Sequence, residues 1–346
     1  MNITLTNCQR YEYKWIRKKP NQSGKNIMKH VIICAAAMTV ASVVTAENWD
    51  MPTPYGDTTF HTQNISQFAD DVRTATDGGL DITVHSAGSL FPHPEIKGAV
   101  RNRQVPMGEF FLSRLSNEDL AYGIDSQPFV ATSYDDAAKL WAAQKPVVTE
   151  LLAEQGLMPL FSVPWPAQGL YTNGEIATVK DLNGLRFRAY NAALEEFATL
   201  AGAAPVQVEA SNIPQAFATG QVAAMITSPS TGVNSTAWDF VTHYTPINAW
   251  VPKNIVVVNK RMFDGLDTAT QTAVLAAAAT AETRGWEMSE AEATSKTTAL
   301  SENGITVYAP SAALVEGLEA IGDTMLSNWT ENASDSARAV LEAYKN

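Results

Sequence analysis

Residues 181–191 read DLNGLRFRAYN, a glycine-led turn followed by side chains that alternate between apolar and polar. Such alternation is typical of a strand, because successive side chains point to opposite faces. The two faces are Leu185, Phe187 and Ala189 on one side and Arg186, Arg188 and Tyr190 on the other. In open α/β sheets, ligands bind at the carboxyl ends of strands, and Arg188 is the arginine nearer that end. Its planar guanidinium matches a carboxylate, so the stretch predicts an anion site; the alternative is a solvated arginine.

Outward from this strand, short β-type runs alternate with helical patterns. The strand-like runs lie at 80–84, 205–208, 223–226 and 254–258, and the helical segments at 192–200, 213–219 and 231–241. This alternation predicts an α/β fold of parallel sheets with helices on both faces. A length of 346 residues fits one or two domains, and two are favoured.

One predicted helix is unusually long. It begins after Asp267, a plausible N-cap, and ends at Glu302 before an Asn-Gly stop signal, with no proline inside it. At 1.5 Å per residue it would span about 50 Å, more than the width of one domain. We therefore expect a strut that spans two domains. The alternative is an ordinary surface helix broken near Gly285.

The first 46 residues differ from the rest. Basic residues crowd their beginning, and the apolar run Val31–Val44 leads to the small residue Ala46. This order predicts a secretory signal peptide, residues 1–46, cleaved near Ala46, and a periplasmic product. A start at Met28 would make the preceding residues an extension of the gene model. The run is about 14 residues, shorter than the roughly 20 of a spanning helix, and an uncleaved anchor is the alternative.

Composition and missing motifs exclude several functions. A net charge of −12 argues against nucleic acid as a partner. Cys8 and Cys34 both lie in the leader and cannot form a disulfide framework or a four-thiolate metal site. The sequence has no nucleophile elbow, Walker loop, dinucleotide fingerprint or H-E-x-x-H motif. We therefore expect no catalytic residue, no metal site and no cofactor.

Several segments together resemble a known family. They are 68–72 (FADDV), 88–90 (GSL), 181–188, 214–222 (PQAFATGQV) and the long helix after Leu266. They are similar to the solute-binding proteins of tripartite ATP-independent periplasmic (TRAP) transporters, the DctP-like family, over the whole region after the leader. The resemblance implies two Rossmann-like domains around a cleft, like a type II periplasmic binding protein. We expect one domain at 47–168 plus about 253–290, and the other at 169–252 plus about 291–346.

The resemblance also assigns roles to residues. The most diagnostic element is Gly184-Leu185-x-x-Arg188, whose arginine clamps the substrate carboxylate in this family. Polar ligand contacts carry over to Asn191 and Ser228. Gln168 stands where many sialic-acid and dicarboxylate binders have a second arginine. The further candidates for the ligand site are Phe60, Phe111, Trp165, Tyr190, Ser211, Trp250 and Asn254.

One arginine, a neutral amide and several rings favour a weakly polar monocarboxylate, especially an aromatic one, since rings stack on flat ligands. The rings could instead be core, or stack on a sugar, which would make the chain a uronate- or aldonate-binding protein. The resemblance implies capture by hinge closure, delivery to the small and large permease subunits, and a monomer. A secreted enzyme on the same scaffold and a ligand sensor remain the alternatives of other classes.

Overall fold

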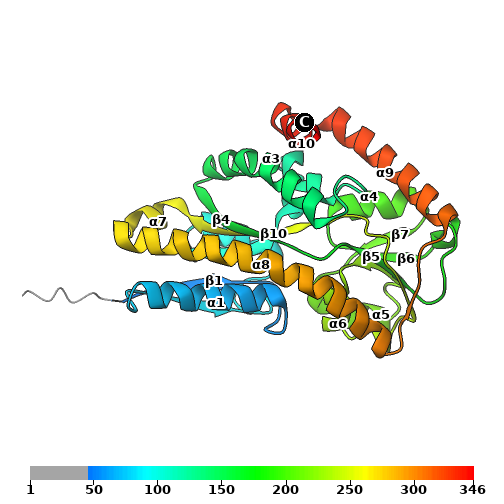
Figure 1. The fold of residues 1–346 in the computed structure, drawn as a ribbon, viewed down its shortest axis with the longest axis horizontal. Coiled ribbons are helices and arrows are strands. Elements are labelled where there is room, and N and C mark those ends of the chain that lie inside the picture. Colours follow the sequence, from blue (N-terminus) through cyan, green and yellow to red (C-terminus); the bar gives the residue numbers. More distant parts are fainter. Residues whose placement is uncertain (1–45) are drawn as a thin grey trace, which may run out of the picture. The chain divides into compact units, whose positions relative to one another are not determined.

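The computed structural model describes residues 46–346. The predicted leader up to residue 45 and the alternative start at Met28 fall outside these described residues. Within them, no helix is both long enough and apolar enough to cross a membrane. The described chain contains two halves, each with its own strands, and the long helix α8 contacts both (Figure 1).

The first half combines a parallel pair, β1 with β2, and a three-stranded sheet in the order β3-β10-β4. Its strands are β1 (Glu47–Pro52), β2 (Leu80–His85), β3 (Met107–Phe111), β4 (Leu157–Pro164) and β10 (Lys253–Asn259). Its helices are α1 (Phe60–Ala75), α2 (His93–Arg101), α3 (Tyr134–Ala153) and α7 (Lys260–Gly265), with 3₁₀ turns at Leu112–Leu115 and Leu120–Ser126.

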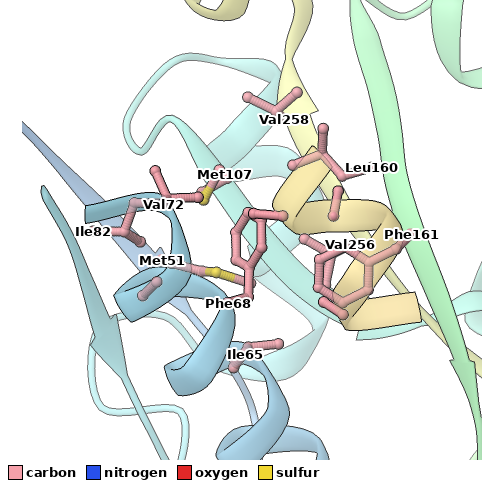
Figure 2. Close-up of a cluster of buried hydrophobic side chains, with 14 of the residues drawn as sticks. Met51, Ile65, Phe68, Val72, Ile82, Met107, Leu160, Phe161, Val256 and Val258 are labelled. Atoms are coloured by element: carbon pink, nitrogen blue, oxygen red, sulfur yellow. The ribbon is translucent and has the colours of Figure 1, made fainter. Parts of the chain in front are cut away.

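The central strand of this sheet, β10, is buried along its whole length, which explains its sequence KNIVVVN. Val256 and Val258 pack into the cluster under α1, while Ile255 and Val257 pack into a second cluster on the other face. A strand covered on both faces reads as a continuous apolar run. Figure 2 shows the first cluster, which α1, β4 and β10 all enter.

The second half is a six-stranded sheet in the order β11-β9-β5-β8-β6-β7. Its strands are β5 (Gly169–Thr172), β6 (Arg186–Ala189), β7 (Ala204–Gln207), β8 (Ala224–Thr227), β9 (His243–Thr245) and β11 (Thr306–Val307). Its helices are α4 (Ala192–Leu200), α5 (Ile213–Ala218), α6 (Pro229–Asn234) and α9 (Ala312–Asn332), with 3₁₀ turns at Val179–Leu182, Ala210–Asn212 and Ala237–Asp239. The α/β fold class expected from the alternating pattern is confirmed.

The expectation of purely parallel sheets is wrong in two places. β10 runs antiparallel to both β3 and β4, and β5 runs antiparallel to β8 and β9. The reason is connectivity. β4 leads the chain out of the first half and β10 leads it back, so neighbouring crossing strands must point in opposite directions. The pairs of β6 with β7 and β8 are parallel, as expected for strands joined through helices.

The predicted helix at 231–241 is also different from the observed one. α6 starts two residues earlier, because Ser228 accepts a hydrogen bond from the Thr231 amide and Pro229 occupies the first helical position. It ends at Asn234, and Thr236 then adopts a left-handed φ of 50°, which no α-helix can contain.

The long helix is confirmed as α8 (Thr268–Glu302), and the Asp267 side chain caps it by accepting from two backbone amides. The helix passes through Gly285 without a break. A Cβ at this position would lie 2.4 Å from the Val163 side chain and 2.7 Å from that of Asn64. Gly285 therefore permits close packing on β4 and α1. Farther along, α8 contacts α6 and β11, so it touches both halves.

The chain returns to the first half at its end. α9 packs against α4 in the second half, whereas α10 (Asp335–Lys345) packs against α3 in the first. The predicted ranges of the two domains, 47–168 plus about 253–290 and 169–252 plus about 291–346, stay a prediction. The packing of α10 places the last residues of the second range against the first half.

Candidate functional site

A small cavity lies where the chain crosses between the halves. Two crossing segments run side by side there: the Trp165 amide donates to the Pro252 carbonyl at 2.7 Å, and the Gln168 amide donates to that of Trp250 at 3.0 Å. The cavity holds about 50 Å³, whereas one water needs about 10–15 Å³ on this measure. Its walls are Tyr55, His93, Phe111, Arg114 and Trp165 from the first half, and Gln168, Arg188, Tyr190, Glu209, Ala210, Thr227, Ser228 and Thr231 from the second half or the crossing.

Arg188 is the buried cation of this cavity. Its side chain belongs to β6 and the residue is only 3% exposed, which excludes the solvated arginine considered from the sequence. Nε donates to the Val208 carbonyl at 3.0 Å, but Nη1 has no hydrogen-bond partner among the described residues. Burial lowers the pKa of Arg188 to about 10, so the group is still charged at neutral pH. A buried guanidinium with an unused donor can bind an anion.

A chain of hydrogen bonds fixes the aromatic wall beside Arg188. The indole N–H of Trp250 donates to the Tyr190 hydroxyl at 3.0 Å, and that hydroxyl donates to Gln168 Oε1 at 3.2 Å. The Tyr190 ring stands at 5.1 Å from Cζ of Arg188 and meets Phe111 edge-on at 5.3 Å. Trp250 itself does not line the cavity; it holds Tyr190 in place.

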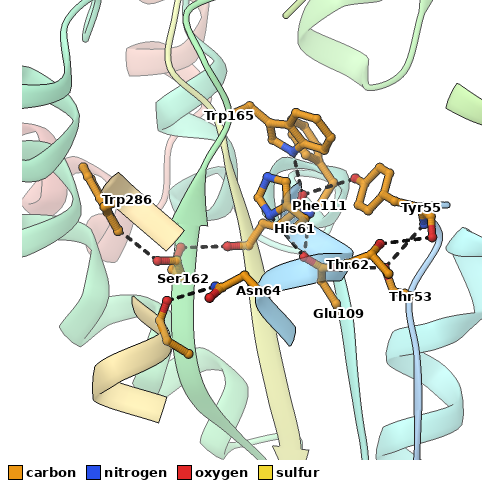
Figure 3. Close-up of polar contacts among 12 residues, drawn as sticks. Thr53, Tyr55, His61, Thr62, Asn64, Glu109, Phe111, Ser162, Trp165 and Trp286 are labelled. Carbon is orange, nitrogen blue, oxygen red and sulfur yellow. Dashed lines mark hydrogen bonds and ion pairs between the residues drawn. The ribbon is translucent and has the colours of Figure 1, made fainter. Parts of the chain in front are cut away.

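Asn254 forms hydrogen bonds with two aromatic side chains of the first-half wall, on the side away from the cavity. Its Oδ1 accepts from the Tyr55 hydroxyl at 3.2 Å and from the Trp165 indole N–H at 2.9 Å, while its Nδ2 donates to Glu109 Oε1 at 2.9 Å. Figure 3 shows these three partners, Tyr55, Trp165 and Glu109. Asn254 is 1% exposed and lies outside the cavity wall. Because Glu109 takes the amide N–H, the amide oxygen must face the two rings.

Glu109 is the buried anion of this network, which we call the Asn254–Glu109 network. Its Oε2 accepts from the Thr53 hydroxyl at 2.6 Å, and His61 Nδ1 lies 3.2 Å from Oε1 without hydrogen-bond geometry. Burial alone would raise the pKa of Glu109, but His61, Thr53 and Asn254 outweigh it and lower that pKa. The carboxylate therefore stays ionised without contacting solvent.

A second charged cluster, His93–Glu209–Arg114, lines the cavity itself. The Phe111 amide donates to His93 Nε2 at 3.0 Å, so the imidazole proton must sit on Nδ1, which lies 3.4 Å from Glu209 Oε2. Arg114 Nη1 lies 3.0 Å from Glu209 Oε1. Burial is the main cause that lowers the pKa of His93. Burial raises the pKa of Glu209, but contacts with His93 and the charges of Arg114 and Arg188 lower it overall.

The remaining predicted site residues lie at different distances from the cavity. Ser228 lines it and also caps α6. Asn191 caps α4, since its Oδ1 accepts from the Leu194 amide, and its Nδ2 donates to Ser113; it is not in the wall. Phe60 packs edge-on behind Trp165 at 5.5 Å. Ser211 lines a neighbouring hollow of about 230 Å³ that shares Tyr55 and Trp165 with the cavity.

The structure thus brings six of the predicted residues into the lining of one cavity: Phe111, Trp165, Gln168, Arg188, Tyr190 and Ser228. Sequence reasoning missed Tyr55, His93, Arg114, Glu209, Ala210, Thr227 and Thr231. Glu209 and Thr227 could have been found, because each follows or ends a strand next to β6, at the same carboxyl edge as Arg188. The residues of the first half carried no comparable signal. No group of metal-type ligands occurs in the described part of the chain.

Comparison with protein families gives the identity of this fold. The model of the family described as DctP, bacterial extracellular solute-binding protein, family 7, matches residues 53–332. The chain belongs to this family. The curated solute-binding protein of Albidiferax ferrireducens is 26% identical over 179 residues, and the match covers 51% of this chain and 52% of that protein. The chain thus matches about half the length of that curated relative.

Solved structures extend the comparison over the described chain. The extracytoplasmic solute receptor DctP7 of Bordetella pertussis, which binds pyroglutamic acid, is 42% identical, with a TM-score of 0.86 over 87% of this chain and 100% of that one. A marine metagenome TRAP solute binding protein specific for pyroglutamate is 40% identical, with a TM-score of 0.85 over 87% and 99% of the two chains. A galacturonate-bound protein from Sulfitobacter sp. NAS-14.1 is 18% identical at a TM-score of 0.78 over 87% and 100%, a likeness of fold alone.

These findings confirm the family predicted from the sequence and the fold of two α/β domains. The family and its structural neighbours are solute-binding receptors rather than enzymes. An extracytoplasmic location is a property of the family.

Proposed function

We propose that this chain is the receptor of a TRAP transporter for pyroglutamate or a closely related small cyclic monocarboxylate, bound through Arg188. The observation that carries the proposal is the buried guanidinium whose Nη1 lacks a partner among the described residues. Burying a charge is costly unless an opposite charge meets it, and a ligand carboxylate would meet this one. The pyroglutamate receptors at 40–42% identity support the choice of acid.

The rest of the cavity supports a small and weakly polar ligand. Tyr55, Phe111, Trp165 and Tyr190 give it aromatic walls, and its small volume of about 50 Å³ favours a small ligand. The hydroxyls of a sugar acid would each need a partner inside a cavity with few free polar groups. This argues against uronates and aldonates as ligands. The aromatic walls can pack against a saturated ring as well as against an aromatic one.

Capture would proceed by closure of the two halves. The crossing segments beside Trp165 and Trp250, together with α8, form the connections that could act as a hinge. Binding drives closure only if the ligand contacts the closed form better than the open one. Walls contributed by both halves meet that condition, because a carboxylate on Arg188 would touch the rings of the first half only after closure.

Delivery to the small and large permease subunits, export to the periplasm through a leader cleaved near Ala46, and a monomeric state belong to the same proposal. The test is isothermal titration of the purified protein, freed of bound ligand, with pyroglutamate, benzoate and glucuronate. We expect pyroglutamate to bind with a Kd of about micromolar or below, a free energy of roughly −8 kcal/mol or better, and the other acids far more weakly. Binding of glucuronate in preference to pyroglutamate would contradict the proposal.

A further inference from the structure

The cavity contains an anion as well as a cation. Arg188 is the penultimate residue of β6, and Glu209 follows the neighbouring strand β7, whose Gln207 pairs with Ala189 in the parallel register. Both side chains therefore reach the same cavity from adjacent strand ends. No ion pair within 4 Å joins them among the described residues, so neither group neutralises the other by contact.

Glu209 still has acceptor capacity for a ligand. Its side chain is 35% exposed, its Oε1 is 3.0 Å from Arg114 and its Oε2 is 3.4 Å from His93. A carboxylate has about four lone-pair positions, and these two contacts use at most one on each oxygen. Because Arg114, His93 and Arg188 stabilise the ionised form, Glu209 accepts hydrogen bonds and donates none.

The neighbouring groups are weaker acceptors than Glu209. His93 Nε2 already accepts from the Phe111 amide, and its Nδ1 carries the proton that faces Glu209. Gln168 Oε1 already accepts from the Tyr190 hydroxyl, and as a neutral oxygen it is a weaker acceptor than an ionised carboxylate. A ligand N–H that enters the cavity beside this cluster therefore has Glu209 as its strongest acceptor.

We infer that Glu209 selects for an N–H group on the ligand, so that the preferred substrates are lactam carboxylates and similar cyclic acids whose ring carries a donor. The inference rests on the proposed function, since it needs a ligand carboxylate on Arg188. Pyroglutamate combines a carboxylate and a lactam N–H on adjacent ring atoms. An ester oxygen in place of that N–H would bring a lone pair against the carboxylate and leave Glu209 without its hydrogen bond.

The experiment compares two rings that differ in one atom: pyroglutamate and its lactone counterpart, 5-oxotetrahydrofuran-2-carboxylate. Isothermal titration gives the ratio of their Kd values for the unmodified protein, Glu209→Gln and Glu209→Ala. We expect the unmodified protein to prefer the lactam by about tenfold to a hundredfold, as for a hydrogen bond to a charged group. Both variants should reduce the preference to about threefold or less. A general loss of affinity cancels in the ratio, as in a double-mutant cycle.

The matched control is Glu319→Gln, an exposed glutamate of α9 that should keep the full preference. An unchanged ratio in both Glu209 variants would overturn the inference, and so would an unmodified protein that binds the two rings equally. In either case, a loss of both ligands in Arg188→Ala would leave the proposed function standing. Failure of both rings to bind the unmodified protein would overturn the proposed function and the inference together.

Discussion

The two walls of the cavity are built on opposite principles. In the wall from the first half, the polar atoms that hold Tyr55 and Trp165 are satisfied internally by the Asn254–Glu109 network. In the wall from the second half, Arg188 has an unused donor and Glu209 has unused acceptor positions. The rings of the first wall therefore supply shape, whereas Arg188 and Glu209 of the second wall are groups that await a partner. In this cavity, Arg188 and Glu209 differ from the residues that hold the rings by their unused hydrogen-bonding capacity.

The Arg188→Ala variant tests this difference between the two walls most directly. We expect it to weaken binding of the carboxylate ligand by about 3–5 kcal/mol, because the carboxylate would be buried without a counter-charge. The stability of the unliganded protein should fall little or rise, since the variant removes a buried, incompletely paired charge. Isothermal titration and urea unfolding measure the two quantities.

The exposed Arg261 of α7 provides the control for this experiment. Arg261→Ala removes the same charge from the protein and should leave the affinity unchanged. If Arg188→Ala binds the ligand as tightly as Arg261→Ala does, the carboxylate is held elsewhere.

The opposite wall should respond in stability, and Glu109→Gln tests this. We expect it to lower the free energy of unfolding by about 1.5–3 kcal/mol at neutral pH, because Asn254 and Thr53 lose an ionised acceptor. The folded state lowers the pKa of Glu109, so its contribution is present above its ordinary value of 4.5 and is lost as pH falls. The difference between the two proteins should therefore shrink as pH falls below 4.5.

Urea unfolding at pH 7 and near pH 3.5 measures this difference, with the exposed Glu319→Gln as a control that should show none. A difference of equal size at both pH values would mean that the charge of Glu109 does not stabilise the network.

The contrast also explains what the sequence could predict. Alternation around Arg188 located its strand, and the capped pattern from Asp267 located α8, since both signals are local. Tyr55 and His93 reach the cavity only because distant segments pack together, and no local pattern encodes that meeting. Asn254 was predicted as a ligand contact, but a polar residue in a buried strand can equally bond to its own neighbours. Sequence periodicity predicts on which face of a strand a side chain lies. It does not predict whether that side chain already has hydrogen-bond partners within the protein.

Gln168→Arg would add a second cation to the wall of the second half. Gln168 lies in the cavity wall beside Arg188, so an arginine there should favour dicarboxylates over monocarboxylates. We expect the ratio of the succinate and pyroglutamate Kd values to shift by about tenfold, or about 1.4 kcal/mol. Competition titration gives this ratio directly, and Gln168→Glu is the matched variant that should shift it the other way. An unchanged ranking in both variants would show that Gln168 does not set specificity.

The smallest expected effect is that of Tyr190→Phe. This variant tests separately the hydroxyl and the ring of one side chain. The hydroxyl belongs to the framework, because it accepts from Trp250 and donates to Gln168, whereas the ring lies beside Arg188 in the cavity wall. Removing the hydroxyl leaves the buried indole N–H of Trp250 unpaired and should lower the free energy of unfolding by about 1 kcal/mol. The ligand affinity should change by less than about threefold, since the ring stays in place. A large loss of affinity without loss of stability would instead make the hydroxyl a direct ligand contact, and would place Tyr190 with Arg188 and Glu209 among the recognition residues.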